Sequence, residues 1–155
     1  HGKMLTPERT VEACVALQAR TQLPLRFLVL GGAAEAERNR AIHAGLLSKG
    51  LDSVDAGVDH SLLRFAALVD RCQLLLVSDS LALHMAIARG VPNVSFYAPT
   101  SAAEIETYGS GLKVASTAAD YCSYRPEASN ATITTERLVH AMAEMLVSSG
   151  VANSP

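Results

Sequence analysis

The sequence has no tryptophan, few aromatic residues (5%) and three cysteines among 155 residues. Cys14, Cys72 and Cys122 are far apart and form no CxxC pair, so we expect three unpaired thiols. The histidines also lack the spacing of metal ligands, and we expect neither a metal site nor a cofactor. Because the net charge is −2, there is no basic excess to indicate a nucleic-acid partner.

No apolar run approaches the roughly 20 residues that a membrane-spanning helix needs. The composition, 49% hydrophobic and 18% charged, is typical of a globular α/β core and argues against disorder. We expect residues 1–150 to form a single domain and residues 151–155 to form a tail.

Short apolar segments alternate with helical segments along the whole chain. This alternation predicts a Rossmann-like fold, with one parallel sheet flanked by helices. The expected strands cover residues 26–30, 51–56, 74–77, 93–98 and 112–115. The expected helices cover about 7–20, 33–49, 61–72 and 81–89, with a last helix capped by Thr134 or Thr135.

The centre of the chain carries the most informative pattern. An apolar run at Leu74–Val77 indicates a buried strand, and 93–98 indicates a second one. Between them, the small polar residues Ser78–Ser80 precede an apolar helix over 81–89, which we expect to be buried. A strand, a helix and another strand form a βαβ unit, and this unit predicts that the two strands are parallel.

The polar turn in this unit is a candidate ligand site. Ligands of parallel sheets bind at the carboxyl ends of the strands, where Ser78, Asp79 and Ser80 would lie. The free N–H groups and the dipole of the following helix suit a phosphate group. The alternative is that Asp79 or Ser80 is an ordinary N-cap with no ligand.

This unit resembles part of the C-terminal half of the heptosyltransferase-like family, glycosyltransferase family 9. That family has an Asp–Ser/Thr–Gly turn, a histidine, an Ala-rich helix, a Gly-x-Pro stop, a strand and Pro–Thr. The matching residues are Asp79, Ser80, His84, Ala86, Ala88, Gly90, Pro92 and Phe96–Thr100, and Leu81 replaces the glycine. Lys3–Arg9 resembles the family's Lys-Arg-Trp-Pro-x-Glu segment, with Leu5 in place of tryptophan, and the resemblance extends over about residues 3–148.

The resemblance implies the donor-binding half of a GT-B architecture. It implies a nucleoside-diphosphate sugar, ADP-heptose-like, whose sugar passes to a hydroxyl of an acceptor glycan or glycolipid such as the lipopolysaccharide core. The catalytic residue is expected in an N-terminal domain that this sequence does not include, so the isolated chain should be inactive. The family's strand ahead of the lysine also has no counterpart, so we expect a portion of a larger cytoplasmic protein, peripheral at the inner membrane.

The resemblance further implies a donor-binding set: Lys3, Gly31, Gly32, Ser78, Asp79, Ser80, Leu81 and His84. Lys3 would neutralise phosphate charge, and His84 would lie near the phosphates. Each has an ordinary alternative. Lys3 can be a solvated surface lysine, His84 a core histidine that bonds a loop carbonyl, and Gly31–Gly32 a tight turn.

Two other functions remain open at this point. One is half of a nucleotide-sugar epimerase with the same two-domain architecture. The other is a degenerate, non-catalytic Rossmann-like module used for protein contact, which Leu81 and the absent tryptophan favour slightly. A Ser–His–Asp hydrolase is excluded, because one helical turn cannot hold these three side chains in triad geometry and no GxSxG motif occurs.

Overall fold

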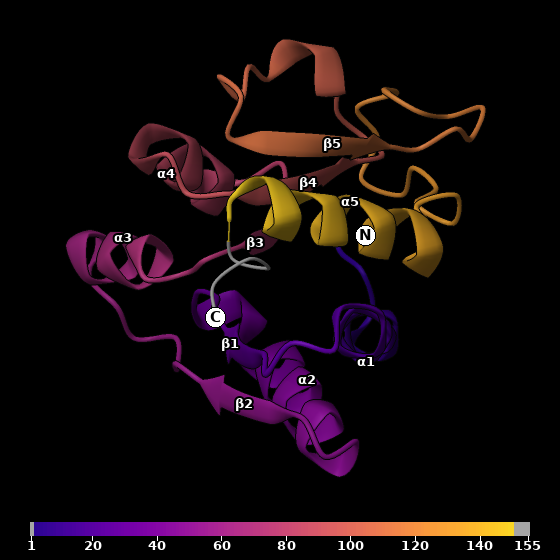
Figure 1. Cartoon of the computed structure of the whole chain (residues 1–155). Helices are drawn as coiled ribbons and strands as arrows, with labels where there is room; N and C mark the ends of the chain where they lie inside the picture. Colours follow the sequence, from indigo (N-terminus) through magenta and orange to yellow (C-terminus); the bar gives the residue numbers. More distant parts are fainter. Residues whose placement is uncertain (1, 151–155) are drawn as a thin grey trace.

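The computed structural model describes residues 2–150, so the expected tail at 151–155 lies outside the described residues (Figure 1). Helices and strands alternate as the sequence predicts. The helices are α1 (Pro7–Thr21), α2 (Ala36–Ser48), α3 (Leu62–Asp70), α4 (Leu81–Arg89) and α5 (Thr135–Ser148), with 3-10 turns η1 (Ala33–Glu35) and η2 (Ala102–Glu104). The strands are β1 (Arg26–Val29), β2 (Asp52–Asp55), β3 (Leu75–Ser78), β4 (Asn93–Tyr97) and β5 (Gly111–Ala115).

Side-chain caps explain where three of the helices begin. The hydroxyl oxygens of Thr6, Ser61 and Thr134 each accept a hydrogen bond, 3.3 Å long, from the backbone N–H three residues later. Each bond satisfies one N–H group that has no partner inside the helix. Of the two caps expected for the last helix, Thr134 and Thr135, the structure confirms Thr134.

The strands form two parallel sheets and not the single sheet expected from the sequence. One sheet has the order β3-β4-β5 and the other contains β1 and β2. Strands β3 and β4 are parallel, with Leu75 opposite Asn93 and Ser78 opposite Phe96, which confirms the βαβ unit. Within the described residues, β1 and β3 each pair on one side only, so no strand pairing joins the two sheets.

The helices form two groups around the strands. Helix α1 packs against α2 and α5, whereas α3 packs against α4 (Figure 1). The main core lies between α1, α5 and the three-stranded sheet, and its apolar side chains include Leu17, Val94, Ile133, Leu138 and Met142. All five residues of β4 are buried, as expected for a strand that pairs on both sides and is covered on both faces.

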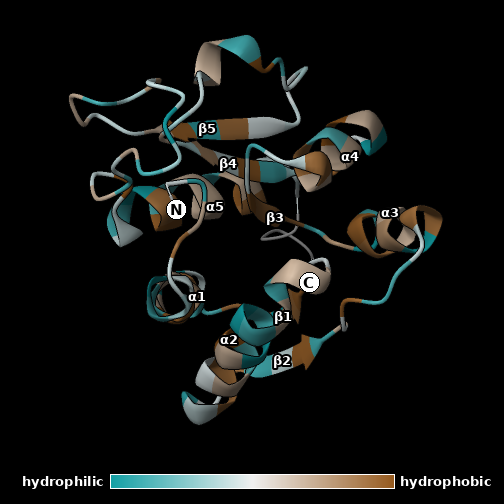
Figure 2. Cartoon of the chain, turned by 180° about the vertical axis from the view of Figure 1, so that it is seen from behind, coloured by the Kyte–Doolittle hydropathy of each residue, from teal (hydrophilic) through white to brown (hydrophobic). Residues whose placement is uncertain are grey.

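Helix α4 is less buried than its apolar sequence predicts. Only Leu83 and Ala86 are fully buried, while Leu81 and His84 are exposed. Helix α3 is also hydrophobic over most of its length, and Leu62 and Leu63 at its start are exposed (Figure 2). The expectation of a buried central helix was therefore wrong: α4 packs along one side and presents its first turn to solvent.

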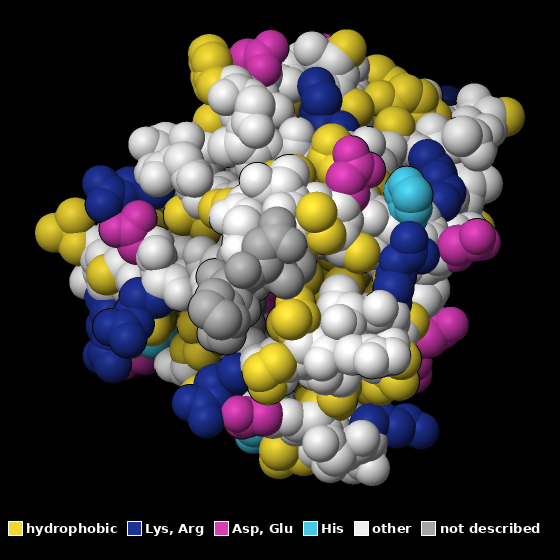
Figure 3. All heavy atoms as spheres, viewed as in Figure 1, with side chains coloured by type: hydrophobic (Ala, Val, Ile, Leu, Met, Phe, Trp, Pro, Cys, Tyr) yellow, Lys and Arg dark blue, Asp and Glu magenta, His cyan; other side chains and the backbone are white. Residues whose placement is uncertain are grey.

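Charged side chains of both signs are interspersed on the face shown in Figure 3. Among residues 2–150, every helix is too short or too polar to cross a lipid bilayer.

The three cysteines are free, which supports the expectation of unpaired thiols. Burial raises the pKa of the Cys14 thiol to about 12 and also raises the pKa of Cys72. At pH 8 a thiol with the pKa of Cys14 is ionised in only about one molecule in ten thousand. We expect Cys14 and Cys72 to react slowly with a thiol reagent in the folded protein, and faster as the pH rises.

The measurement is labelling followed by mass spectrometry, with Cys14→Ser as the control for assignment. The denatured, unreduced protein should give three labels. A single label there would contradict the free-thiol structure, and rapid native labelling of Cys14 would contradict its burial.

Candidate functional site

The candidate site lies where β3 ends and α4 begins. Ser78 is the last residue of β3, and Ser80 is the N-cap of α4 with an extended backbone. The predicted Ser78–Ser80 turn is therefore at the carboxyl end of a parallel strand. The Ser80 hydroxyl makes no capping bond, and the backbone amides of Leu81 and Ala82 have no hydrogen-bond partner among the described residues. Two donors at the positive end of the helix are thus free.

Lys3 and His84 both approach Asp79 at this turn. Lys3 Nζ donates to Asp79 Oδ2 at 3.2 Å and to the Asp79 carbonyl at 3.3 Å. His84 Nε2 lies 3.9 Å from Asp79 Oδ1. The side chains of Lys3 and His84 are 46% and 58% exposed, whereas that of Asp79 is only 19% exposed. The alternative of His84 as a core histidine is therefore wrong, because its ring faces solvent.

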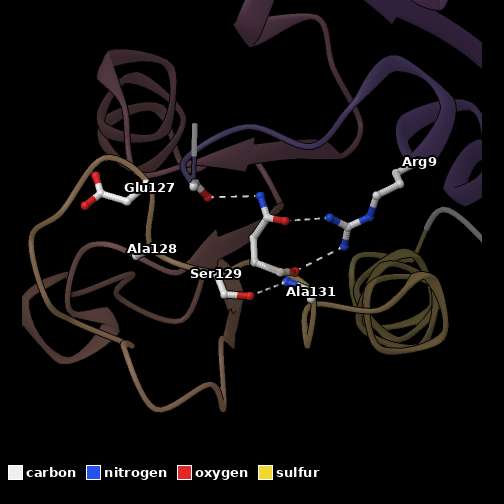
Figure 4. Close-up of a pocket in the computed structure, with 7 residues that line it drawn as sticks. Arg9, Glu127, Ala128, Ser129 and Ala131 are labelled. Carbon is white, nitrogen blue, oxygen red and sulfur yellow. Dashed lines mark hydrogen bonds between the residues drawn. The ribbon is translucent and has the colours of Figure 1, made fainter.

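Loop 126–133 holds Lys3 in place. Asn130 Nδ2 donates to the carbonyls of Gly2 (3.2 Å) and Met4 (2.9 Å), the two neighbours of Lys3. Arg9 in turn donates to Asn130 Oδ1 at 2.6 Å and to the Asn130 carbonyl at 3.2 Å (Figure 4). These side chains line an open hollow of about 430 Å³. Because Arg9 and Asn130 bond to each other and to backbone groups, their role is to hold the backbone in place and not to bind a ligand.

A second contact anchors the same segment to α2. Leu5 is buried, and the Arg38 guanidinium donates to the Leu5 carbonyl at 3.0 and 3.3 Å. Burial lowers the pKa of Arg38, and the charge of Glu35 opposes this shift. Segment 3–5 therefore lies between the residues that follow β3 and those that follow β1.

The structure places Gly31 and Gly32 between β1 and the 3-10 turn η1. A side chain at Gly31 would bring its Cβ within 2.5 Å of Asn39 Nδ2, so close packing requires a glycine there. The Gly32 amide donates to Glu35 Oε2 at 2.8 Å and is already satisfied. Both glycines thus have a packing or turn role, which the sequence analysis gave as their alternative.

The loop after β5 also contributes to this edge of the sheet. The amide of Cys122 donates to Ala98 (2.9 Å) and that of Tyr124 to Pro99 (2.8 Å), although both residues have positive φ angles, 60° and 58°. This backbone conformation is uncommon for residues with side chains. This contact could not be predicted from the sequence, because segment 117–131 has no periodicity and is typical of a surface loop.

Tyr97 lies beneath the site at the end of β4. Its hydroxyl donates to Ser95 Oγ at 2.9 Å. Burial raises the pKa of Tyr97, and the negative charge of Asp79 adds to this rise. Tyr97 is therefore a neutral, buried side chain near Asp79. No cluster of three or more His, Cys, Asp or Glu side chains suited to a metal ion occurs in the described part of the chain.

Comparison with known proteins identifies the family of the chain. The model of a family described as glycosyltransferase family 9 (heptosyltransferase) matches residues 14–132. Among solved structures, a glycosyl transferase family 9 protein from Veillonella parvula DSM 2008 is similar, with a TM-score of 0.75 and 19% sequence identity. The match covers 95% of this chain and 43% of that protein, so the chain spans less than half of its length. No curated protein matches.

The Arg9–Asn130 contacts generate a testable prediction. Asn130→Ala removes the bonds that hold the backbone on both sides of Lys3, so we expect a loss of about 1–3 kcal/mol in the free energy of unfolding. Denaturant unfolding measures this loss. The matched control is Arg125→Ala, which truncates an exposed side chain directly before the same loop and should change stability by less than about 0.5 kcal/mol. Equal stability of both variants would contradict the anchoring role.

Proposed function

The chain belongs to glycosyltransferase family 9, and on this premise we propose that it binds the nucleotide-sugar donor of a glycosyltransferase. The reaction moves a sugar from a nucleoside diphosphate to an acceptor hydroxyl. The observation that supports the proposal is the uncapped start of α4 at the carboxyl end of β3, with Lys3 directly beside it.

The start of α4 suits the diphosphate. The free amides of Leu81 and Ala82 can donate to phosphate oxygens, and the helix dipole adds positive potential at the same point. Negative charge develops on the diphosphate as the sugar–phosphate bond breaks. Fixed donors at this position stabilise the leaving group and so lower the barrier.

Lys3 supplies the cationic charge. In the structure, its ammonium group is paired with Asp79, which keeps it within reach of the α4 amides. The pair is partly exposed, so its contribution to stability is small, about 0–1 kcal/mol, and the lysine can turn toward a phosphate at little cost. His84 Nε2 lies near the other carboxylate oxygen, Asp79 Oδ1. The charge of Lys3 offsets the repulsion between the Asp79 carboxylate and the ligand.

Leu81 limits the affinity of this site. Its side chain is 59% exposed at the first position of α4, where the family pattern has glycine. The side chain keeps a diphosphate away from the helix amides that would bind it. Donor binding by this chain is therefore weak.

The remaining parts of the enzyme belong to a region of the protein other than residues 1–155. We place the acceptor site and the catalytic residue in an N-terminal domain that completes a GT-B architecture. We further propose an ADP-heptose-like donor and a lipopolysaccharide-core acceptor, with the reaction on the cytoplasmic side of the inner membrane. The isolated chain binds the donor without turning it over.

The effect of Leu81 provides the test. Leu81→Gly should tighten binding of ADP or UDP by about twofold to fivefold, since closer approach to a helix start contributes about 0.3–1 kcal/mol. Titration calorimetry measures both nucleotides on both proteins. Because glycine destabilises the helix by about 0.5–1 kcal/mol, circular dichroism must show that the variant is folded.

Lys3→Met tests the cationic contribution and should weaken binding about fivefold, the equivalent of about 1 kcal/mol. Lys49→Met is the matched control, because Lys49 lies at the far end of α2. The donor-site proposal fails if the folded wild-type and Leu81→Gly proteins both bind neither nucleotide at millimolar concentration. The non-catalytic module would then explain the chain better.

A further inference from the structure

Two loops meet at the carboxyl ends of β4 and β5, beside the start of α4. Loop 98–104 follows β4 and includes η2, and loop 116–124 follows β5. Because β4 pairs with β3, the carboxyl ends of these two strands lie about 5 Å apart. Burial raises the pKa of Tyr97, and the proximity of both Asp79 and Tyr121 adds to this rise. The α4 turn and loop 116–124 therefore border the same tyrosine.

Side-chain hydrogen bonds join the two loops. The Tyr121 hydroxyl accepts from the Ala102 amide at 2.9 Å, and the Tyr124 hydroxyl donates to Glu104 Oε1 at 2.5 Å. Lys113 Nζ, on β5, donates to two backbone carbonyls in and after η2, each at 2.9 Å. Tyr124 and Glu104 are thus held in a fixed position relative to each other.

Tyr124 presents its ring to solvent. The residue is 57% exposed, although its hydroxyl is bonded to Glu104. Its φ angle is 58°, and its amide donates to the Pro99 carbonyl at 2.8 Å. A residue with a side chain keeps such a conformation only where the surrounding contacts impose it. The ring is therefore an exposed aromatic surface on a fixed backbone, which is suited to stacking against a ligand.

Two hydroxyl groups beside this ring lack partners. Thr100 Oγ1 and Ser123 Oγ are buried, and neither has a hydrogen-bond partner among the described residues. Thr100 directly follows Pro99, whose carbonyl accepts from the Tyr124 amide, and Ser123 directly precedes Tyr124. Buried polar groups in folded proteins are normally bonded, and a ligand that carries hydroxyl groups would supply the partners that these two lack.

The charge of Glu104 indicates the class of ligand. Glu104 is exposed, and its carboxylate repels phosphate and carboxylate groups. The ammonium group of Lys113, which could attract an anion, is bonded to backbone carbonyls. A carboxylate beside an aromatic ring instead suits a neutral ligand with hydroxyl groups, since carboxylate oxygens are strong acceptors. A sugar ring has such hydroxyl groups and a C–H face that can cover the tyrosine.

We propose that Tyr124 and Glu104 bind a neutral sugar ring, whose C–H face stacks on Tyr124 and whose hydroxyl groups donate to Glu104. The inference rests on the proposed function, because a sugar attached to a diphosphate at the start of α4 lies at the same edge of the sheet. A ring of the acceptor glycan has the same chemistry, and the experiment distinguishes the two sources.

Titration calorimetry with ADP and ADP-heptose tests the donor sugar. The wild-type chain should bind ADP-heptose about twofold to tenfold more tightly than ADP, the range expected for one stacked ring. Tyr124→Ala should abolish this difference and leave the affinity for ADP unchanged. Tyr124→Phe retains the ring and should keep most of the difference, whereas Glu104→Gln should reduce it.

Tyr108→Ala is the matched control. Tyr108 is also an exposed tyrosine with a positive φ angle, 83% exposed with φ 50°. It precedes β5, whereas Tyr124 follows β5, so the two lie at opposite ends of the sheet. The control should retain the wild-type difference between ADP-heptose and ADP, and circular dichroism should show that all four variants are folded.

The acceptor is tested with a second probe, the oligosaccharide of deacylated lipopolysaccharide, added to the ¹⁵N-labelled chain without a nucleotide. Shift changes at the amides of Glu104 and Tyr124, with equal affinities for ADP and ADP-heptose, would assign the sugar ring to the acceptor. The same shift changes in a chain that binds no ADP would refute the donor site at α4 and leave the sugar site in place.

Three results would overturn the sugar site. The first is a Tyr124→Ala variant that loses affinity for ADP and ADP-heptose equally, which would show a structural role for the tyrosine. The second is an equal loss of the sugar-dependent difference in Tyr108→Ala and Tyr124→Ala. The third is the absence of any such difference in the wild-type chain together with no shift change at Glu104 and Tyr124 on addition of the oligosaccharide.

Discussion

The pairing of β4 with a parallel strand on each side is the constraint on which the rest of the structure depends. Because β4 is held by both β3 and β5, the carboxyl ends of all three strands lie at one edge. Helix α4 must begin at that edge, since Ser80 follows β3 by only two residues. This register alone brings together three features: the free amides of α4, the buried Tyr97 and the loop bonded to Ala98.

The site then depends on contacts between distant parts of the chain. Lys3 reaches Asp79 because Asn130 bonds the backbone on both sides of it and Arg38 bonds the carbonyl of Leu5. The backbone of a short N-terminal segment is thus held by loop 126–133 and by α2. Weak ion pairs between exposed groups would not order such a segment, whereas several hydrogen bonds to its backbone do.

The sequence was sufficient to predict the helices, the strands and the position of the Ser78–Ser80 turn, because apolar periodicity and capping residues are local signals. It was not sufficient for the split sheet, because edges depend on which strands are neighbours in space. The sequence also did not predict the role of Asn130 or the bond from Cys122 to Ala98, directly after β4, since Asn130 and Cys122 lie in segments without periodicity. Gly31 could be recognised as a turn residue, but its close contact with Asn39 depends on how α2 packs.

The most direct measurement is a titration of the ¹⁵N-labelled protein with ADP, followed by amide chemical shifts. Binding at the start of α4 predicts the largest shift changes at Ser80, Leu81 and Ala82, with a smaller change at Lys3. Shift changes confined to the hollow around Arg9 would contradict a donor site at the carboxyl end of β3.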